Sequence, residues 1–291
     1  MKPILIDERI TANKLLHIKT IDSPYLNSPF HFHDNCEMIY IEDGYGIKVI
    51  GDHVSIFNKG DIILMGPNVP HILTNDEDFY KGNRHLRSKA IVIYFSPALL
   101  DNLLPHSALD SFQKLVKKSS RGLEIIGGTK NVIGKEFETF TIQDELTQLS
   151  VFFSILNMLS TAKEAKYLSS ETFINTYTGQ DSAKVNAIYQ FLMKNFKRDI
   201  QLEEVADVAH MAPTAFCRFF KQRTQKTFSF FINELRIHHA CELMNNPDRT
   251  ITEIFYECGY HNPTNFNKFF KAITGETPSA YRKKIINDVT L

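Results

Sequence analysis

The chain has 291 residues, of which 43% are apolar and 23% are charged. This composition is that of a globular protein and excludes a largely disordered chain, and the length predicts two domains with a connector. Lys and Arg together number 33, as do Asp and Glu, so the net charge of zero excludes a uniformly basic nucleic-acid binder.

The charge is unevenly distributed along the chain. Residues 183–284 hold 15 Lys and Arg against 10 Asp and Glu, whereas the rest of the chain holds 18 against 23. A basic C-terminal module hints at a polyanionic partner for that end, although a chance imbalance would give the same counts.

Cysteines and apolar runs indicate the compartment. The four cysteines are at least 17 residues apart, which fits no zinc module. The N-terminus has no apolar run long enough for a secretory signal, and the stretch near 151–159 is too short to span a bilayer. We therefore expect a cytoplasmic protein with free thiols and no membrane partner.

Residues 30–96 predict short strands. Turns rich in Gly, Asp and Asn separate β-branched and apolar runs at 37–41, 45–50, 54–57, 62–65 and 90–95. Many short strands broken by such turns indicate an antiparallel barrel or sandwich.

From about residue 97 to 163 the pattern is helical. An apolar stripe at helical spacing is formed by Leu146, Leu149, Phe153 and Leu156. The stripe either packs on its own domain or pairs with a second copy, and the pattern leaves both open. Residues 164–182 are polar and are expected to form an interdomain linker.

The strand region contains a cluster of potential metal ligands. On a strand, His31, His33 and Glu37 point to one side, which continues with Ile39 and is therefore expected to face the interior. With His71 from a neighbouring strand they could surround a divalent metal. The alternative is a metal-free pocket in which these groups need hydrogen-bond partners.

A ligand pocket at this place would be lined by His31, His33, Glu37, Tyr40 and His71. Tyr25 and Tyr45 are further candidates, although an aromatic core would explain all three tyrosines as well.

Two stretches in the C-terminal third share one layout. Each has a short amphipathic helix, a tight turn and a second helix that begins with proline, at Pro213 and Pro263. In each second helix three phenylalanines share one face, and the opposite face carries small polar and basic side chains that suit a DNA major groove. These side chains are Thr214, Cys217, Arg218 and Lys221 in the first helix and Thr264, Asn267, Lys268 and Lys271 in the second.

This combination resembles the DNA-binding domain of the AraC/XylS family of transcription regulators. The resemblance is carried by Gly259-Tyr260, by Arg236 on a linking helix of about 229–244, and by the closing run from Gly275 to Arg282. It implies two helix-turn-helix units with recognition helices in successive major grooves. The family's base-facing positions then correspond to Thr214, Cys217 and Arg218, and to Thr264, Asn267 and Lys268. Ala212 departs from the family, which often has a capping Ser there.

The N-terminal cluster is similar to the two motifs of the cupin family. His31, His33, Glu37 and Gly44 match the first motif, whereas the second keeps its glycine and His71 but departs at 66–68. The resemblance implies the sensor barrel of many AraC-like regulators. Cupins also include metal-dependent oxygenases and isomerases.

Together these patterns predict an α+β multidomain fold, with an N-terminal antiparallel β-barrel that is cupin-like and carries helices, and an all-α C-terminal domain with two helix-turn-helix units. The expected domains are a ligand-sensing barrel at 1–100, a helical dimerisation region and linker at 101–180, and the DNA-binding domain at 181–291. An N-terminal arm, about 1–28, could transmit the ligand signal.

The predicted function is sequence-specific transcription regulation without enzymatic activity. The expected partners are double-stranded DNA, a small-molecule effector, a second copy of the chain and, by resemblance, RNA polymerase. The resemblance makes a sugar plausible as the effector and activation the commoner mode. No cofactor is certain, and a divalent metal is the candidate. The alternatives are a metal-dependent cupin enzyme with an appended helical domain, and an interaction module without a DNA role.

Overall fold

The computed structural model describes residues 15–82, 85–99, 101, 106–162, 164–175 and 179–289. The chain forms two compact units, one mostly before residue 176 and the other mostly after residue 177. Within the described residues, no helix is long and apolar enough to cross a membrane.

The N-terminal unit is built on two β-sheets. The larger sheet has the order β1-β7-β2-β5-β8-β9, and all its neighbouring strands are antiparallel. Its strands are β1 (Leu16–Ser23), β2 (Cys36–Asp43), β5 (Ile62–Met65), β7 (Ser88–Phe95), β8 (Leu123–Ile125) and β9 (Ala165–Tyr167). The smaller sheet, in the order β4-β3-β6, consists of β3 (Gly46–Ile50), β4 (His53–Phe57) and β6 (His71–Asn75). The predicted antiparallel architecture is confirmed.

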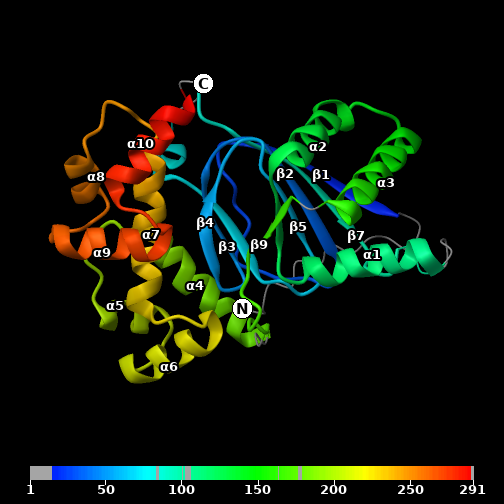
Figure 1. The fold of residues 1–291 in the computed structure, drawn as a ribbon. Coiled ribbons are helices and arrows are strands. Elements are labelled where there is room, and N and C mark those ends of the chain that lie inside the picture. The colour runs from blue at the N-terminus through cyan, green and yellow to red at the C-terminus, as the bar shows by residue number, and fades with distance from the viewer. Residues whose placement is uncertain are drawn as a thin grey trace. The chain divides into compact units, whose positions relative to one another are not determined.

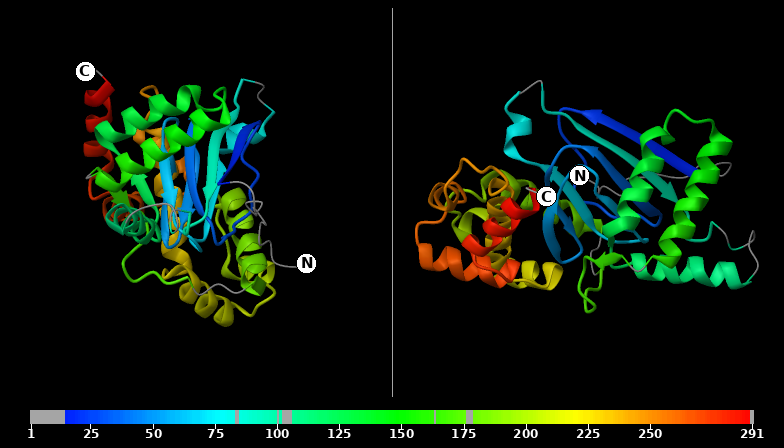
Figure 2. Two further views of the ribbon diagram at one scale, coloured as in Figure 1. Left: turned by 90° about the vertical axis from the view of Figure 1, so that its right-hand side faces the viewer. Right: turned by 45° about the horizontal axis from the view of Figure 1, so that its top comes forward.

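The side chains of the larger sheet alternate between its two faces, and each face packs against a core of its own. One face packs on α1 (His106–Ser119), α2 (Gly127–Phe140) and α3 (Glu145–Thr161), which share a core with Met38 of β2. Figure 1 and Figure 2 show α2 and α3 lying along this face. The other face, which carries Ile39, shares a second core with Ile50 of the smaller sheet. This second core is the barrel interior.

The apolar stripe on α3 is divided between two environments. Leu156 is buried and Leu149 is partly buried against the sheet, whereas Leu146 and Phe153 are 77% and 36% exposed. Half of the stripe therefore packs within its own unit, and the other half faces solvent.

The first part of the predicted linker is fixed to the N-terminal unit. Residues Ala165–Tyr167 form β9, Ser169 Oγ donates to the carbonyl of Ile50 (3.0 Å), and Asn175 Nδ2 donates to the carbonyl of Asn68 (2.8 Å). Main-chain pairing therefore overrides the polar composition here. Residues 176–178 lie outside the described part of the chain.

Every described element after residue 178 is a helix, as the yellow-green to red part of Figure 2 shows. The helices are α4 (Gly179–Asn195), α5 (Leu202–Val208), α6 (Pro213–Thr224), α7 (Phe228–Leu243), α8 (Ile251–Glu257), α9 (Pro263–Thr274) and α10 (Pro278–Val289). The pairs α5–α6 and α8–α9 are the two predicted helix-turn-helix units, and α7 is the long helix between them.

The four cysteines are free thiols, as expected. Cys36, Cys241 and Cys258 are buried, whereas Cys217 on α6 is exposed. Burial raises the pKa of Cys36 and the pKa of Cys241 to about 12 each, so these thiols stay protonated at neutral pH.

Candidate nucleic-acid interface and effector pocket

Each helix-turn-helix unit turns through one residue in the left-handed conformation. This residue is His210 (φ 53°) after α5 and Gly259 (φ 75°) after α8. A Cβ atom at Gly259 would lie 2.2 Å from the carbonyl oxygen of Lys197, so only glycine fits the second turn. The first turn accepts a non-glycine residue at the cost of backbone strain.

The second helices of the two units begin differently. The side chain of Asn262 accepts hydrogen bonds from the main-chain N–H groups of Thr264 and Asn265 at the start of α9 (2.8 and 3.3 Å). Ala212, at the start of α6, also has an extended backbone (φ −66°, ψ 146°) but makes no side-chain cap. The sequence departure at Ala212 thus leaves the first N–H groups of α6 without that support.

Buried phenylalanines fix which face of α6 and α9 turns outward. Phe216 and Phe220 are buried on α6, and Phe266 and Phe270 are buried on α9. The ring of Phe220 lies 5.4 Å from that of Phe231 on α7, at an edge-to-face angle of 82°. The aromatic faces of both helices are therefore committed to the core of the C-terminal unit.

The side chains predicted to face DNA are exposed on both helices. None of the four basic side chains among them has an ion-pair partner within the described residues, so their charge is available to an anionic ligand. The exposed residues are Thr214, Cys217, Arg218 and Lys221 on α6 and Thr264, Asn267, Lys268 and Lys271 on α9.

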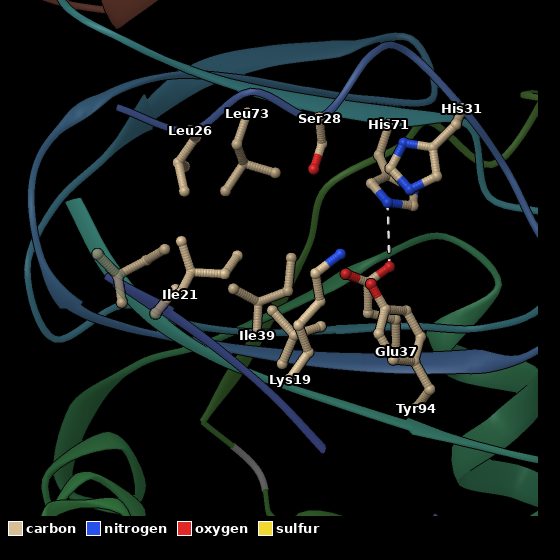
Figure 3. Close-up of a pocket in the computed structure, with 13 residues that line it drawn as sticks. Lys19, Ile21, Leu26, Ser28, His31, Glu37, Ile39, His71, Leu73 and Tyr94 are labelled. Carbon is tan, nitrogen blue, oxygen red and sulfur yellow. Dashed lines mark ion pairs between the residues drawn. The ribbon is translucent and has the colours of Figure 1, made fainter. Parts of the chain in front are cut away.

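In the barrel interior, His31, His33, Glu37 and His71 come together, all at most 4% exposed. Their potential ligand atoms lie within 4.8 Å of one another. Glu37 lies on β2 and His71 begins β6, while His31 pairs with His71 through main-chain hydrogen bonds of 3.1 and 2.8 Å. Figure 3 shows the imidazole rings of His31 and His71 above the Glu37 carboxylate.

The three histidines are oriented in the same way. Nδ1 of His31, His33 and His71 lies 2.8, 3.0 and 2.8 Å from the main-chain carbonyl oxygen of a residue two positions away. Since a carbonyl oxygen only accepts, each Nδ1–H donates, and Nε2 of a neutral ring is then an acceptor. Such orientation by a second hydrogen bond is typical of metal-ligating histidines.

At the centre of the cluster the accepting Nε2 atoms of two histidines therefore face the carboxylate of Glu37, which also only accepts. Nε2 of His33 and of His71 lies 2.8 and 3.0 Å from Oε2 of Glu37. His71 Nε2 makes no well-aligned hydrogen bond with a described residue. Two close acceptors need a proton or a cation between them, and imidazole with carboxylate is a ligand set that several divalent metals accept.

Protonation changes accompany this arrangement. Burial lowers the pKa of His31 to about 3, so its ring is neutral. Burial also opposes charge on His33 and Glu37. However, the hydrogen bond and charge of Glu37 raise the pKa of His33, and the charge of His71 and the hydrogen bond from His33 lower the pKa of Glu37. The carboxylate is therefore ionised.

Tyr40 does not join this pocket, which corrects the prediction from the sequence. Its ring stacks on Phe137 of α2, with centroids 4.8 Å apart, because Tyr40 alternates with Glu37 and Ile39 and faces the helices. The ring of Tyr25 contacts that of Tyr80 in a tilted arrangement, with centroids 4.4 Å apart.

Lys19, Ser28 and Tyr94 line the cavity, and sequence reasoning missed them. The sequence does hold one indication for Tyr94. It lies two and four residues after Val92 and Ala90 on β7, so all three side chains point to the same face.

Comparison with known proteins gives two domain matches. Residues 23–80 match the model of a cupin domain, and residues 205–284 match the model of a helix-turn-helix domain. The Msm operon regulatory protein of Streptococcus mutans is 23% identical over 88% of this chain and 86% of its own length. The HTH-type transcriptional activator RhaR of Escherichia coli is 24% identical over 87% of this chain and 86% of its own length.

Solved structures also resemble the chain. ToxT from Vibrio cholerae matches 92% of this chain and 98% of its own chain, with 18% identity and a TM-score of 0.36. The DNA-binding domain of AdpA in complex with a target DNA matches 33% of this chain and 87% of its own chain, with 23% identity and a TM-score of 0.32.

Proposed function

We propose that the chain is a DNA-binding transcription regulator of the AraC type, in which α6 and α9 read DNA under the control of the barrel. The proposal is supported by the cupin match before the helix-turn-helix match and by the regulators among the relatives. In this proposal residues 1–100 sense a ligand, residues 101–180 contribute to dimerisation and residues 181–291 bind DNA. The protein acts in the cytoplasm and contacts RNA polymerase, and activation is the expected mode.

One observation carries the proposal for DNA. The two recognition helices present matching exposed faces, each with a threonine in its first turn and two basic side chains, over pairs of buried phenylalanines. Arg and Lys on such a face contact phosphates and guanine edges, and small polar residues allow close approach to the bases.

A gel-shift titration with a DNA sequence that the full chain selects from a randomised library, which serves as the operator, tests this interface. Arg218→Ala and Lys268→Ala should each weaken specific binding by about 1–3 kcal/mol, or roughly 5- to 160-fold, if each contacts a base. The control is Lys284→Ala on α10, which removes one positive charge from a side chain that is 66% exposed and outside both recognition helices. Wild-type affinity in both test variants would contradict the assignment.

Salt dependence separates DNA binding from a protein-interaction role. Neutralising phosphates releases counterions, so affinity for DNA should fall steeply as salt rises. A flat salt response would favour an interaction module.

We further propose a homodimer formed through the solvent-facing part of α3. Leu146 and Phe153 lie there, and neighbouring Ile142 is 84% exposed. Large apolar side chains gathered at one exposed place are typical of an interface. Light scattering should show a dimer for the wild type and a monomer for Leu146→Glu. The control is Glu145→Gln, which changes an exposed neighbour without adding charge to the apolar patch.

The acceptor arrangement in the barrel favours a third proposal, a bound divalent metal. His31, His33, Glu37 and His71 would hold it, and a metal there would supply a Lewis-acidic point for a polar effector group. Elemental analysis should find about one metal per wild-type chain and none in His33→Ala. Metal in neither protein would leave protons between these acceptors. Because the relatives are regulators, we propose sensing rather than turnover for this cluster.

A further inference from the structure

The turn between β5 and β6 touches two distant parts of the chain at once. It consists of residues 66–70, and Asn68 at its centre has a left-handed backbone (φ 60°). Pro67 and Pro70 lie on either side of Asn68, and each proline fixes its own φ and restricts the residue before it. The segment is therefore stiff, and we call it the proline turn.

One side of the proline turn is bonded to the histidine cluster, which consists of His31, His33, Glu37 and His71. The main-chain N–H of Asn68 donates to the carbonyl oxygen of His33 (2.7 Å). The carbonyl oxygen of Val69 accepts from Nδ1 of His71 (2.8 Å), whose Nε2 faces Glu37. A change in what His33 and His71 bind at Nε2 therefore acts on the turn through these two hydrogen bonds.

The other side of the proline turn holds the chain that leads to the DNA-binding helices. The carbonyl oxygen of Asn68 accepts from Nδ2 of Asn175 (2.8 Å), and α4 begins only four residues later, at Gly179. Asn68 thus bonds His33 through its N–H and Asn175 through its C=O. A displacement of Asn68 changes both hydrogen bonds.

The bond at Asn175 sets the length of the tether between the barrel and α4. Further back, the main-chain N–H of Ser170 donates to Oδ1 of Asp52 (2.9 Å). If the bond at Asn175 opens while the bond at Ser170 holds, residues 171–175 can join the tether. Five residues of extended chain span at most about 17 Å, so the tether lengthens by up to this distance.

We propose that the proline turn transmits the occupancy of the histidine cluster to the tether, by closing or releasing the hydrogen bond between Asn175 and Asn68. The tether of the DNA-binding helices is short when this bond is closed and longer when it is open. The inference rests on the proposed function, in which the barrel controls DNA binding. It assigns a role to residues 66–68, where the sequence departs from the second cupin motif.

Hydrogen exchange of the full chain, without ligand or DNA, tests transmission from the tether to the cluster. Asn175→Asp keeps the shape of the side chain but removes the N–H donor. One neutral hydrogen bond shifts an equilibrium by roughly fivefold, so exchange should become about two- to fivefold faster in peptides that contain residues 66–71 and 31–36. The amide of His31 reports on the cluster because it donates to the carbonyl oxygen of His71.

A purely local bond would behave differently. It would change exchange at residues 171–175 alone, and that result would overturn the proposal. The control is Glu171→Gln, in the same segment, because its carboxylate is 86% exposed and its ion pair with Arg121 (3.4 Å) involves no residue of the proline turn. This variant should exchange like wild type in both peptides.

Proteolysis tests transmission in the opposite direction. Chymotrypsin cuts after Phe173 once residues 171–175 leave the barrel, so the initial rate of this cut measures the open state. Zinc chloride, compared with EDTA, and Glu37→Gln both change what the histidine Nε2 atoms bind. Each should change the rate by about two- to fivefold in a chain with Asn175 and leave it unchanged in Asn175→Asp.

Wild-type rates that respond to neither treatment, or Asn175→Asp rates that respond equally, would overturn the proposal. A thermal melt shows whether Glu37→Gln is folded, and the exchange experiment decides the matter without that variant. Gel shifts of the same preparations keep the two claims separate. DNA binding with exchange unchanged at 31–36 refutes only the transmission, whereas transmission without DNA binding refutes only the regulator.

Discussion

A serine at position 212 should stabilise the first recognition helix. The backbone of Ala212 already has the extended conformation of an N-cap, and α6 begins at the next residue. A serine hydroxyl there could accept a hydrogen bond from the N–H of Thr214 or Ala215 without backbone movement. In the second unit Asn262 already makes two such bonds, so Asn262→Ala is the reverse experiment.

Both changes should be of similar size and opposite sign. An N-cap side chain contributes about 0.5–2 kcal/mol, typically near 1, so amide exchange in the capped helix should change by roughly fivefold. Hydrogen exchange followed by mass spectrometry on the full chain measures this separately for peptides from α6 and α9. Ala212→Ser should slow exchange in α6, and Asn262→Ala should speed exchange in α9.

Matched variants make this reasoning refutable. Ala212→Val supplies no acceptor and is as poor an N-cap as alanine, so it should not slow exchange in α6, whereas Asn262→Ser keeps an acceptor and should retain most of the protection in α9. If Ala212→Ser and Ala212→Val gave the same exchange in α6, capping would not account for the difference between the two helices.

Three further changes probe the C-terminal unit. Gly259→Ala should destabilise it severely in urea unfolding, because the new Cβ would meet the carbonyl oxygen of Lys197 at 2.2 Å, and a wild-type midpoint would contradict the turn geometry. Tyr260→Phe should lower the free energy of unfolding by about 1–3 kcal/mol, since it removes the donor to Asn233 Oδ1 (2.6 Å) in a buried site; an unchanged value would mean that another group replaces it. Iodoacetamide at pH 8 should modify Cys217 and not the three buried cysteines, and operator DNA should protect Cys217, whereas equal labelling with and without DNA would place α6 away from the groove.

Local patterns were sufficient to predict the helices and the histidine cluster. The spacing of Phe216 and Phe220 identifies the buried face of α6, because helix geometry relates residues three and four apart. His33 and Glu37 meet inside the barrel as predicted, but His33 precedes β2 and lies on no strand, so alternation accounts for the direction of Glu37 alone. Strand alternation sends Tyr40 to the face opposite Glu37, so the sequence itself already argues against a place for Tyr40 in the pocket.

Other features depend on pairing between distant strands. Lys19 reaches the cavity because β1 pairs with β7 in the register that sets it opposite Val92, and no local pattern contains that register. The anchored segment before residue 176 was missed for a similar reason. Its polar side chains resemble a linker, but Ser169 and Asn175 use their polarity to bind main-chain carbonyl groups of the barrel.

Selection from a randomised DNA library with the purified full chain tests the central claim most directly. Two recognition helices in successive major grooves should enrich two conserved blocks about 10–10.5 base pairs apart. Arg218→Ala should relax the sequence preference in one block only, and Lys268→Ala in the other only. An absence of enrichment, or two variants that leave both blocks unchanged, would contradict the account.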